Sequence, residues 1–133
     1  MRLLLLPCCL LMLCFLSAGP GGADEAAKPA KAPRFAHASI EAYSNAVVSL
    51  RAPDSGMIFY VESDGRRLVA LDRQGVLAWG VDVFEEAKVK PYLGKPVIRH
   101  LRLDGDNLWA TCGKKDSVRI DVDTGKAEWA GRD

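Results

Sequence analysis

The chain is poor in the residues that most catalytic and metal sites need. It has only two histidines, His37 and His100, and they are too far apart for a metal-binding spacing such as His-x-x-x-His. Neither stands in a sequence context typical of a catalytic nucleophile and base, so both are expected to be solvated or hydrogen-bonded. No Gly-rich phosphate loop, Gly-x-Ser-x-Gly or Cys-x-x-Cys motif is present. The sequence therefore predicts no catalytic residue, no metal site and no cofactor.

Cysteine is also scarce in the part of the chain that we expect to fold. Of the 4 cysteines, Cys8, Cys9 and Cys14 lie in an apolar N-terminal segment, and only Cys112 lies beyond it. A single cysteine cannot form an intramolecular disulfide, so stability must come from packing. We expect Cys112 to be a small buried hydrophobe, and the alternative is an exposed thiol that reacts or cross-links.

The chain has no surplus of charge of either sign. It contains 18 basic and 17 acidic residues, and removal of residues 1–18 takes away Arg2 and no acid. The remaining positive and negative side chains balance. This excludes the basic surplus that is typical of nucleic-acid binding, and gives no support for an acidic substrate or a membrane surface.

The N-terminus has the pattern of a secretory signal peptide. Arg2 precedes an apolar run over residues 3–16, and small residues follow at 17–19. The run is shorter than the roughly 20 residues of a membrane span, and no cysteine follows a small residue as lipidation would require. We predict a signal peptide over residues 1–18, with cleavage after Ala18 or as late as Ala23, and an uncleaved anchor is the alternative. The mature protein would be exported, periplasmic or extracellular, without a stable membrane anchor.

The composition then divides the rest of the chain. Residues 19–37 are rich in Gly, Ala, Pro and Lys and predict a flexible segment. Residues 38–133 are predicted to form a β domain. Within it, residues 38–45 suggest either a helical turn or an extra edge strand.

Two stretches of the β domain each predict four short strands joined by tight turns. The first unit, residues 46–81, has strand patterns over 46–51, 57–62, 67–72 and 76–81. The second unit, residues 97–130, has them over 97–103, 108–112, 117–122 and 126–130. The connector over 82–96 has acidic residues followed by lysines, and predicts one or two helical turns that end before Pro91.

The two units also repeat one phrase. VALDRQGVLAW (69–79) and VRIDVDTGKAEW (118–129) each place an aspartate at the end of the third strand, a glycine in the turn and a tryptophan in the fourth strand. The second copy has one extra turn residue. The fold class that follows is all-β, with two consecutive four-stranded antiparallel meanders packed as a small two-sheet domain.

The repeat resembles the blade of the pyrroloquinoline-quinone-type β-propellers, in which a strand ends in Ala-Leu-Asp, a turn carries Thr-Gly and the next strand ends in Trp. The resemblance covers residues 46–130 and implies blade-like units. The quinone enzymes of that class bind cofactor and metal on a complete ring of blades, and no such set of residues is found in this chain.

The hydrophobic pattern differs between the two units. Leu68–Leu71 is apolar on both faces of its strand, which predicts a sheet covered on both sides. The stretch from Val118 to Val122 alternates, which predicts one face in water. We expect residues 38–45, together with four residues of the connector, to cover the open face of the first sheet. The four are Val83, Phe84, Val89 and Leu93. This cover favours a compact monomer or weak homodimer over a ring of several copies.

Several polar and aromatic groups invite a functional interpretation beside a structural one. Asp121 and Asp123, with Gly125, could suggest a calcium-binding loop, but two acidic residues are too few for one. We expect both aspartates to cap turn amides, and we expect the same of Asp104 and Asp106.

Three basic pairs could meet the acids of a partner, although such charges are usually solvated and discourage strand pairing. These pairs are Arg66 with Arg67, Arg99 with Arg102, and Lys114 with Lys115. The tryptophans could stack ligands, although packing between sheets is expected of strand-end tryptophans. They are Trp79, Trp109 and Trp129.

Three function classes follow, in decreasing order of support. The first is an exported, non-catalytic module of the cell envelope that binds another envelope or secreted protein. The second is a small-ligand or carbohydrate-binding protein with sites between blades of an oligomeric ring, which exposed tryptophans would favour. An enzyme comes last, because no catalytic set of residues is present.

Overall fold

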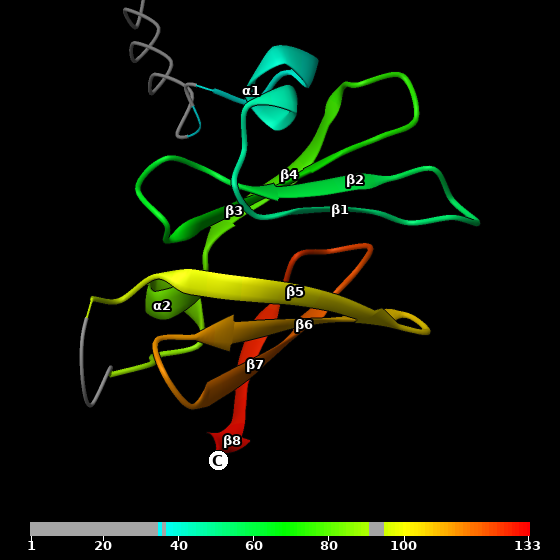
Figure 1. The fold of residues 1–133 in the computed structure, drawn as a ribbon. Coiled ribbons are helices and arrows are strands. Elements are labelled where there is room, and N and C mark those ends of the chain that lie inside the picture. The colour runs from blue at the N-terminus through cyan, green and yellow to red at the C-terminus, as the bar shows by residue number, and fades with distance from the viewer. Residues whose placement is uncertain (1–34, 36, 91–94) are drawn as a thin grey trace, which may run out of the picture. The chain divides into compact units, whose positions relative to one another are not determined.

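Eight short strands form two antiparallel sheets, each a four-stranded meander (Figure 1). The computed structural model describes residues 35, 37–90 and 95–133. The first sheet has the order β1-β2-β3-β4 and the second β5-β6-β7-β8. The strands of the first sheet are β1 (Ser49–Arg51), β2 (Ile58–Val61), β3 (Arg67–Leu71) and β4 (Leu77–Asp82). Those of the second are β5 (Ile98–Asp104), β6 (Asn107–Cys112), β7 (Asp116–Asp121) and β8 (Ala127–Arg132). The predicted all-β, two-sheet fold is confirmed.

The segment before β1 is helical, which decides between the two alternatives for residues 38–45. Helix α1 (Ile40–Ser44) begins at the N-cap Ser39, whose side chain accepts a hydrogen bond from the amide of Ala42. The predicted first strand is shorter than expected, because residues 46–48 form a bend between this helix and β1, although the Val48 carbonyl still accepts a hydrogen bond from the amide of Val61 at 2.9 Å. Val47, within the bend, is 99% exposed.

The inward faces of the two sheets share one hydrophobic core. Phe59 and Leu68 of the first sheet belong to the same buried cluster as Leu108 and Ile120 of the second. Helix α2 (Val83–Glu86) adds Val83 and Phe84 to this cluster. The Asp82 carboxylate caps the helix by accepting hydrogen bonds from the amides of Phe84 and Glu85.

The outward face of the first sheet is covered by the segment that precedes it. Ile58, Tyr60, Val69 and Leu71 form a second buried cluster with Phe35, against which Ala38, Ala42, Tyr43 and Ala46 pack. Figure 1 shows α1 on the side of the first sheet that faces away from the second. The prediction that Leu68–Leu71 is buried on both faces is therefore confirmed.

The predicted cover for that face was only partly right. Residues 38–45 lie over it, but Val83, Phe84 and Val89 belong to the core between the sheets. The reason is that α2 follows β4 directly at the end where the chain crosses to the second sheet. Leu93 lies outside the described residues.

The second sheet has one open face, as its alternating pattern predicts. Along β7, Val118 and Ile120 are fully buried, whereas Arg119 and Asp121 are exposed. The residues that pair with Arg119 in the neighbouring strands share its face.

The two tryptophans of the repeated phrase occupy different positions. A bulge skips Ala78, so that Trp79 pairs with Ala70 on the face that meets the second sheet. The second unit has no bulge at this point, and Trp129 pairs with Val118 instead of Arg119. Ala70 and Val118 both belong to the core between the sheets, so the pairing places both indoles on the side of their sheet that faces this core. In β8 the bulge instead follows the tryptophan, at Ala130.

The two indoles nevertheless make different contacts. Trp79 Nε1 donates to the carbonyl of Val122 at 2.7 Å, and its ring lies against Gly125, where an added Cβ would come within 2.6 Å of it. Trp129 is 54% exposed, and its Nε1 donates to Asp116 at 3.3 Å. The expectation that these tryptophans pack between the sheets holds for Trp79 and is wrong for Trp129.

The predicted signal peptide and most of the predicted flexible segment lie outside the described residues. Phe35 falls at the end of that segment and is nonetheless buried, over Gly80 and beside the guanidinium of Arg67. Within the described ranges, no helix is long and apolar enough to cross a membrane.

Candidate functional site

The open face of the second sheet carries a row of four large side chains. Arg102 pairs with Trp109, Trp109 with Arg119, and Arg119 with Glu128, so the row crosses all four strands. The Arg102 guanidinium lies 5.9 Å from the centre of the Trp109 ring, within the range of a cation–π contact. We call these four residues the open-face row.

The charges of the open-face row are only partly compensated. Glu128 accepts a hydrogen bond from Arg119 at 2.8 Å and forms an ion pair with Lys126 at 2.9 Å. The hydrogen bond from Lys126, and to a smaller extent that from Arg119, hold the pKa of Glu128 below its usual range. Within the described ranges, Arg102 has no carboxylate partner. The row therefore presents two arginines against one glutamate.

Strand β5, which carries Arg102 at the edge of the sheet, extends this basic character. Arg99 and His100 on β5 are exposed, and no ion pair involves either of them in the described part of the chain. Lys114 and Lys115 are also exposed, as predicted, but they lie in the turn between β6 and β7. The face can thus offer arginine side chains and an indole to a ligand that carries negative charge.

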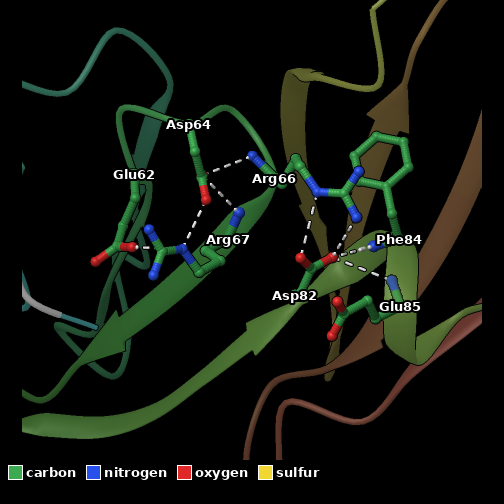
Figure 2. A network of polar contacts seen from close by, with 7 residues as sticks. All are labelled: Glu62, Asp64, Arg66, Arg67, Asp82, Phe84 and Glu85. Carbon is green, nitrogen blue, oxygen red and sulfur yellow. Dashed lines mark hydrogen bonds and ion pairs between the residues drawn. The ribbon is translucent and has the colours of Figure 1, made fainter. Parts of the chain in front are cut away.

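A second polar group of residues surrounds the turn between β2 and β3 (Figure 2). Arg66 and Arg67 were predicted to be solvated charges, and this was wrong. Arg66 makes two hydrogen bonds of 3.3 Å to Asp82 and lies 5.1 Å from the centre of the Phe84 ring. It thereby ties the turn to the N-cap of α2.

Arg67 stands between two carboxylates. Its Nε lies 2.6 Å from Asp64 Oδ2 and 3.0 Å from Glu62 Oε2. Burial alone would raise the pKa of Asp64, but hydrogen bonds from the amides of Arg66 and Arg67 and from the Arg67 side chain lower it. Two carboxylates therefore share this guanidinium.

Glu62 is the most unusual polar residue of the described chain. Its side chain has no exposed surface, and neither carboxylate oxygen accepts a hydrogen bond within the described residues. Oε2 faces Arg67, and Figure 2 shows the other oxygen pointing away from it. A buried carboxylate normally has several hydrogen-bond donors, because an unpaired charge is expensive to remove from water.

A cavity of about 510 Å³ borders Glu62, between the α1 segment and the end of β2. The Tyr60 hydroxyl beside it donates to the carbonyl of His37 and accepts from the amide of Ser39. Burial raises the pKa of Tyr60, and the negative charge of Glu62 raises it further. The hydrogen bond from the Ser39 amide acts in the opposite direction and lowers the pKa. The lining residues are His37, Ala42, Asn45, Ala46, Val47, Val48, Tyr60, Val61, Glu62, Ser63, Gly65 and Ile98.

Asp121 of the second repeat caps turn amides, as one of its two interpretations predicted, whereas within the described ranges no turn amide donates to the Asp123 carboxylate. Asp121 Oδ1 accepts hydrogen bonds from the amides of Asp123 and Thr124, and from the Thr124 hydroxyl at 2.7 Å. The bonds from Thr124 lower the pKa of Asp121. Asp104 and Asp106 differ from the prediction, since no turn amide within the described ranges donates to either carboxylate.

Cys112 is fully buried and free, which confirms the first interpretation of this residue. Burial raises the pKa of its thiol to about 12, and the charge of Asp116 adds to this effect. A thiol with this pKa is a poor nucleophile at neutral pH.

Glu62 was missed in the sequence because its strand pattern ends there. In MIFYVE (57–62) the alternation already places Glu62 on the face of Tyr60, but nothing in the segment shows that the α1 segment and Phe35 cover this face. A glutamate at a strand end is ordinarily solvated.

No protein-family profile matches this sequence, and no curated protein matches it either. In the described part of the chain, no three His, Cys, Asp or Glu side chains are placed to hold a metal ion. Inference about function therefore depends on the open-face row and on the Glu62 cavity.

Proposed function

We propose that the chain is an exported, non-catalytic interaction module of the cell envelope that acts as a monomer or weak dimer. Its open-face row binds an acidic segment of another envelope or secreted protein. The arginines would pair with carboxylates of that segment, and Trp109 would pack against an apolar or aromatic side chain next to them.

The observation that carries this proposal is the contrast between the two sheets. The first sheet is covered on both faces by its own chain, whereas the second leaves Arg102, Trp109 and Arg119 on an uncovered face. Tryptophan and arginine are the residue types most enriched at binding hot spots. Arg102, which has no carboxylate partner among the described residues, supplies the charge that complements an acidic partner.

The alternative, a ligand site between blades of a ring, is less well supported. A ring requires a neighbouring copy to pack on the outward face of the first sheet. Phe35, which is buried, and the partly buried Ala38, Ala42, Tyr43 and Ala46 pack on that face.

Binding of an acidic probe should depend on the arginines of the row. We expect a soluble peptide of alternating glutamate and tyrosine to shift the amide signals of Arg102, Trp109 and Arg119, and the Trp109 indole signal, in NMR titrations. The double variant Arg102→Ala/Arg119→Ala should bind about tenfold more weakly, because two charge-assisted contacts are lost. Added salt should weaken binding further.

The matched control is Lys114→Ala/Lys115→Ala, which removes the same charge from a turn outside the row. It should leave the affinity of the peptide unchanged within about twofold. An equal loss in both double variants would mean that only net charge matters, and would refute a site at the row.

Export predicts a processed N-terminus. Mass spectrometry of protein recovered from the periplasm or medium should find a chain that starts at Gly19, or at Asp24 for the later cleavage. A stable product that still begins at Met1 in the membrane fraction would contradict this prediction. A variant with Leu5→Arg, which interrupts the apolar run, should accumulate unprocessed and serves as the control.

A further inference from the structure

We propose that the cavity bordered by Glu62 is a binding site for a small organic cation, namely a primary ammonium group on a short apolar chain. This site is separate from the open-face row and lies on the first sheet. It would give the module a small-molecule ligand in addition to its protein partner.

The charge of the site favours a cation. Glu62 and Asp64 are both within ion-pair distance of one guanidinium, that of Arg67, and the closer contact is to Asp64. Arg66 does not relieve this imbalance, because it is paired with Asp82. The buried Glu62 carboxylate therefore lies in a region with more negative than positive charge, where a cationic ligand is stabilised more strongly than in water.

The hydrogen bonding of Glu62 also favours an ammonium group. Oε1 is buried and has no hydrogen-bond partner in the described part of the chain. Because the side chain is fully buried at the cavity wall, contact requires the carboxyl to turn toward the cavity. That rotation gives up the 3.0 Å ion pair between Glu62 Oε2 and Arg67 Nε, while Arg67 keeps its 2.6 Å contact with Asp64. The ammonium group of the ligand then takes the place of the guanidinium as the charge partner of Glu62. An ammonium group supplies three donors to the oxygens that it meets.

The rest of the cavity sets the kind of chain that the ammonium group carries. Ala42, Val48 and Ile98 provide apolar wall. The polar side chains of the lining besides Glu62 are those of His37, Asn45, Tyr60 and Ser63, and the Tyr60 hydroxyl already donates to the His37 carbonyl. The volume of about 510 Å³ lies within the range of small-molecule sites. The geometry fits an alkylammonium group better than a sugar or an anion, because few polar groups converge here and the buried charge is negative.

The test uses n-butylammonium chloride as the probe and 1-butanol as its neutral counterpart. Titration of the mature protein at pH 7, followed by amide NMR, should give saturable shifts at Asn45, Val48 and Gly65. We expect a dissociation constant in the millimolar range, as is usual for a ligand with few non-hydrogen atoms. Butanol should bind at least about tenfold more weakly, because it lacks the charge that pairs with Glu62.

Variants then assign the site. Glu62→Gln preserves the shape of the side chain and should weaken butylammonium binding about tenfold. Asp123→Asn removes the same charge from the exposed turn between β7 and β8, outside the cavity, and should change the affinity by less than about threefold. Ala46→Leu, which narrows the cavity without touching Glu62, should also weaken binding and covers the case in which Glu62→Gln fails to fold. Absence of saturable shifts, equal binding of butanol, or unchanged affinity in both Glu62→Gln and Ala46→Leu would overturn the proposal.

Discussion

Replacing Phe84 with alanine is expected to lower the free energy of unfolding by about 3–5 kcal/mol. Phe84 is 4% exposed and belongs to the core that joins the two sheets, and its ring also lies under the Arg66 guanidinium. Truncation leaves a cavity at the point where α2 connects both sheets. Denaturant unfolding of the wild-type and variant proteins measures the difference.

A surface variant provides the control for Phe84→Ala. Val47→Ala removes part of an apolar side chain that is 99% exposed, and should change stability by less than about 0.5 kcal/mol. A loss below about 1 kcal/mol for Phe84→Ala would show that α2 does not bridge the sheets, and would contradict the two-sheet packing described above.

Trp79→Ala should lower the free energy of unfolding by about 2–4 kcal/mol, somewhat less than for a fully buried tryptophan. The indole is half-buried, donates to the carbonyl of Val122 and packs on Gly125, so its loss removes a direct contact between the sheets. The same denaturant experiment measures this effect.

Trp129→Ala is the matched control, since it changes the residue that occupies the same place in the repeated phrase. We expect a loss below about 1 kcal/mol, because Trp129 is 54% exposed and Asp116 keeps its hydrogen bonds to Arg132. Equal losses for the two variants would mean that both tryptophans hold the sheets together, and would contradict the packing described above, in which Trp79 is packed against the core and Trp129 is exposed.

The amino-acid sequence by itself determined the elements and the class of fold. Strand patterns such as those over 67–72 and 117–122 match β3 and β7 to within a residue. The continuous apolar stretch Leu68–Leu71 also predicted a sheet covered on both faces, and the alternation around Arg119 predicted an open one. These inferences succeeded because they depend on local turn chemistry and on the two-residue period of a strand, which any strand of this composition shares.

Only the tertiary structure decided what each face meets. The repeated phrase treats Trp79 and Trp129 alike, but the bulge precedes Trp79 at Ala78 and follows Trp129 at Ala130, and only Trp79 packs against the core between the sheets while Trp129 is 54% exposed. The sequence predicted that Phe84 is buried, but on the outward face of the first sheet. The structure places it in the core between the sheets, because α2 lies where the chain crosses from one sheet to the other.

Glu62 is buried because a segment more than 15 residues away in the sequence, from Phe35 to Ala46, lies over its face. Contacts of this kind follow from packing between distant segments, and no local pattern encodes them.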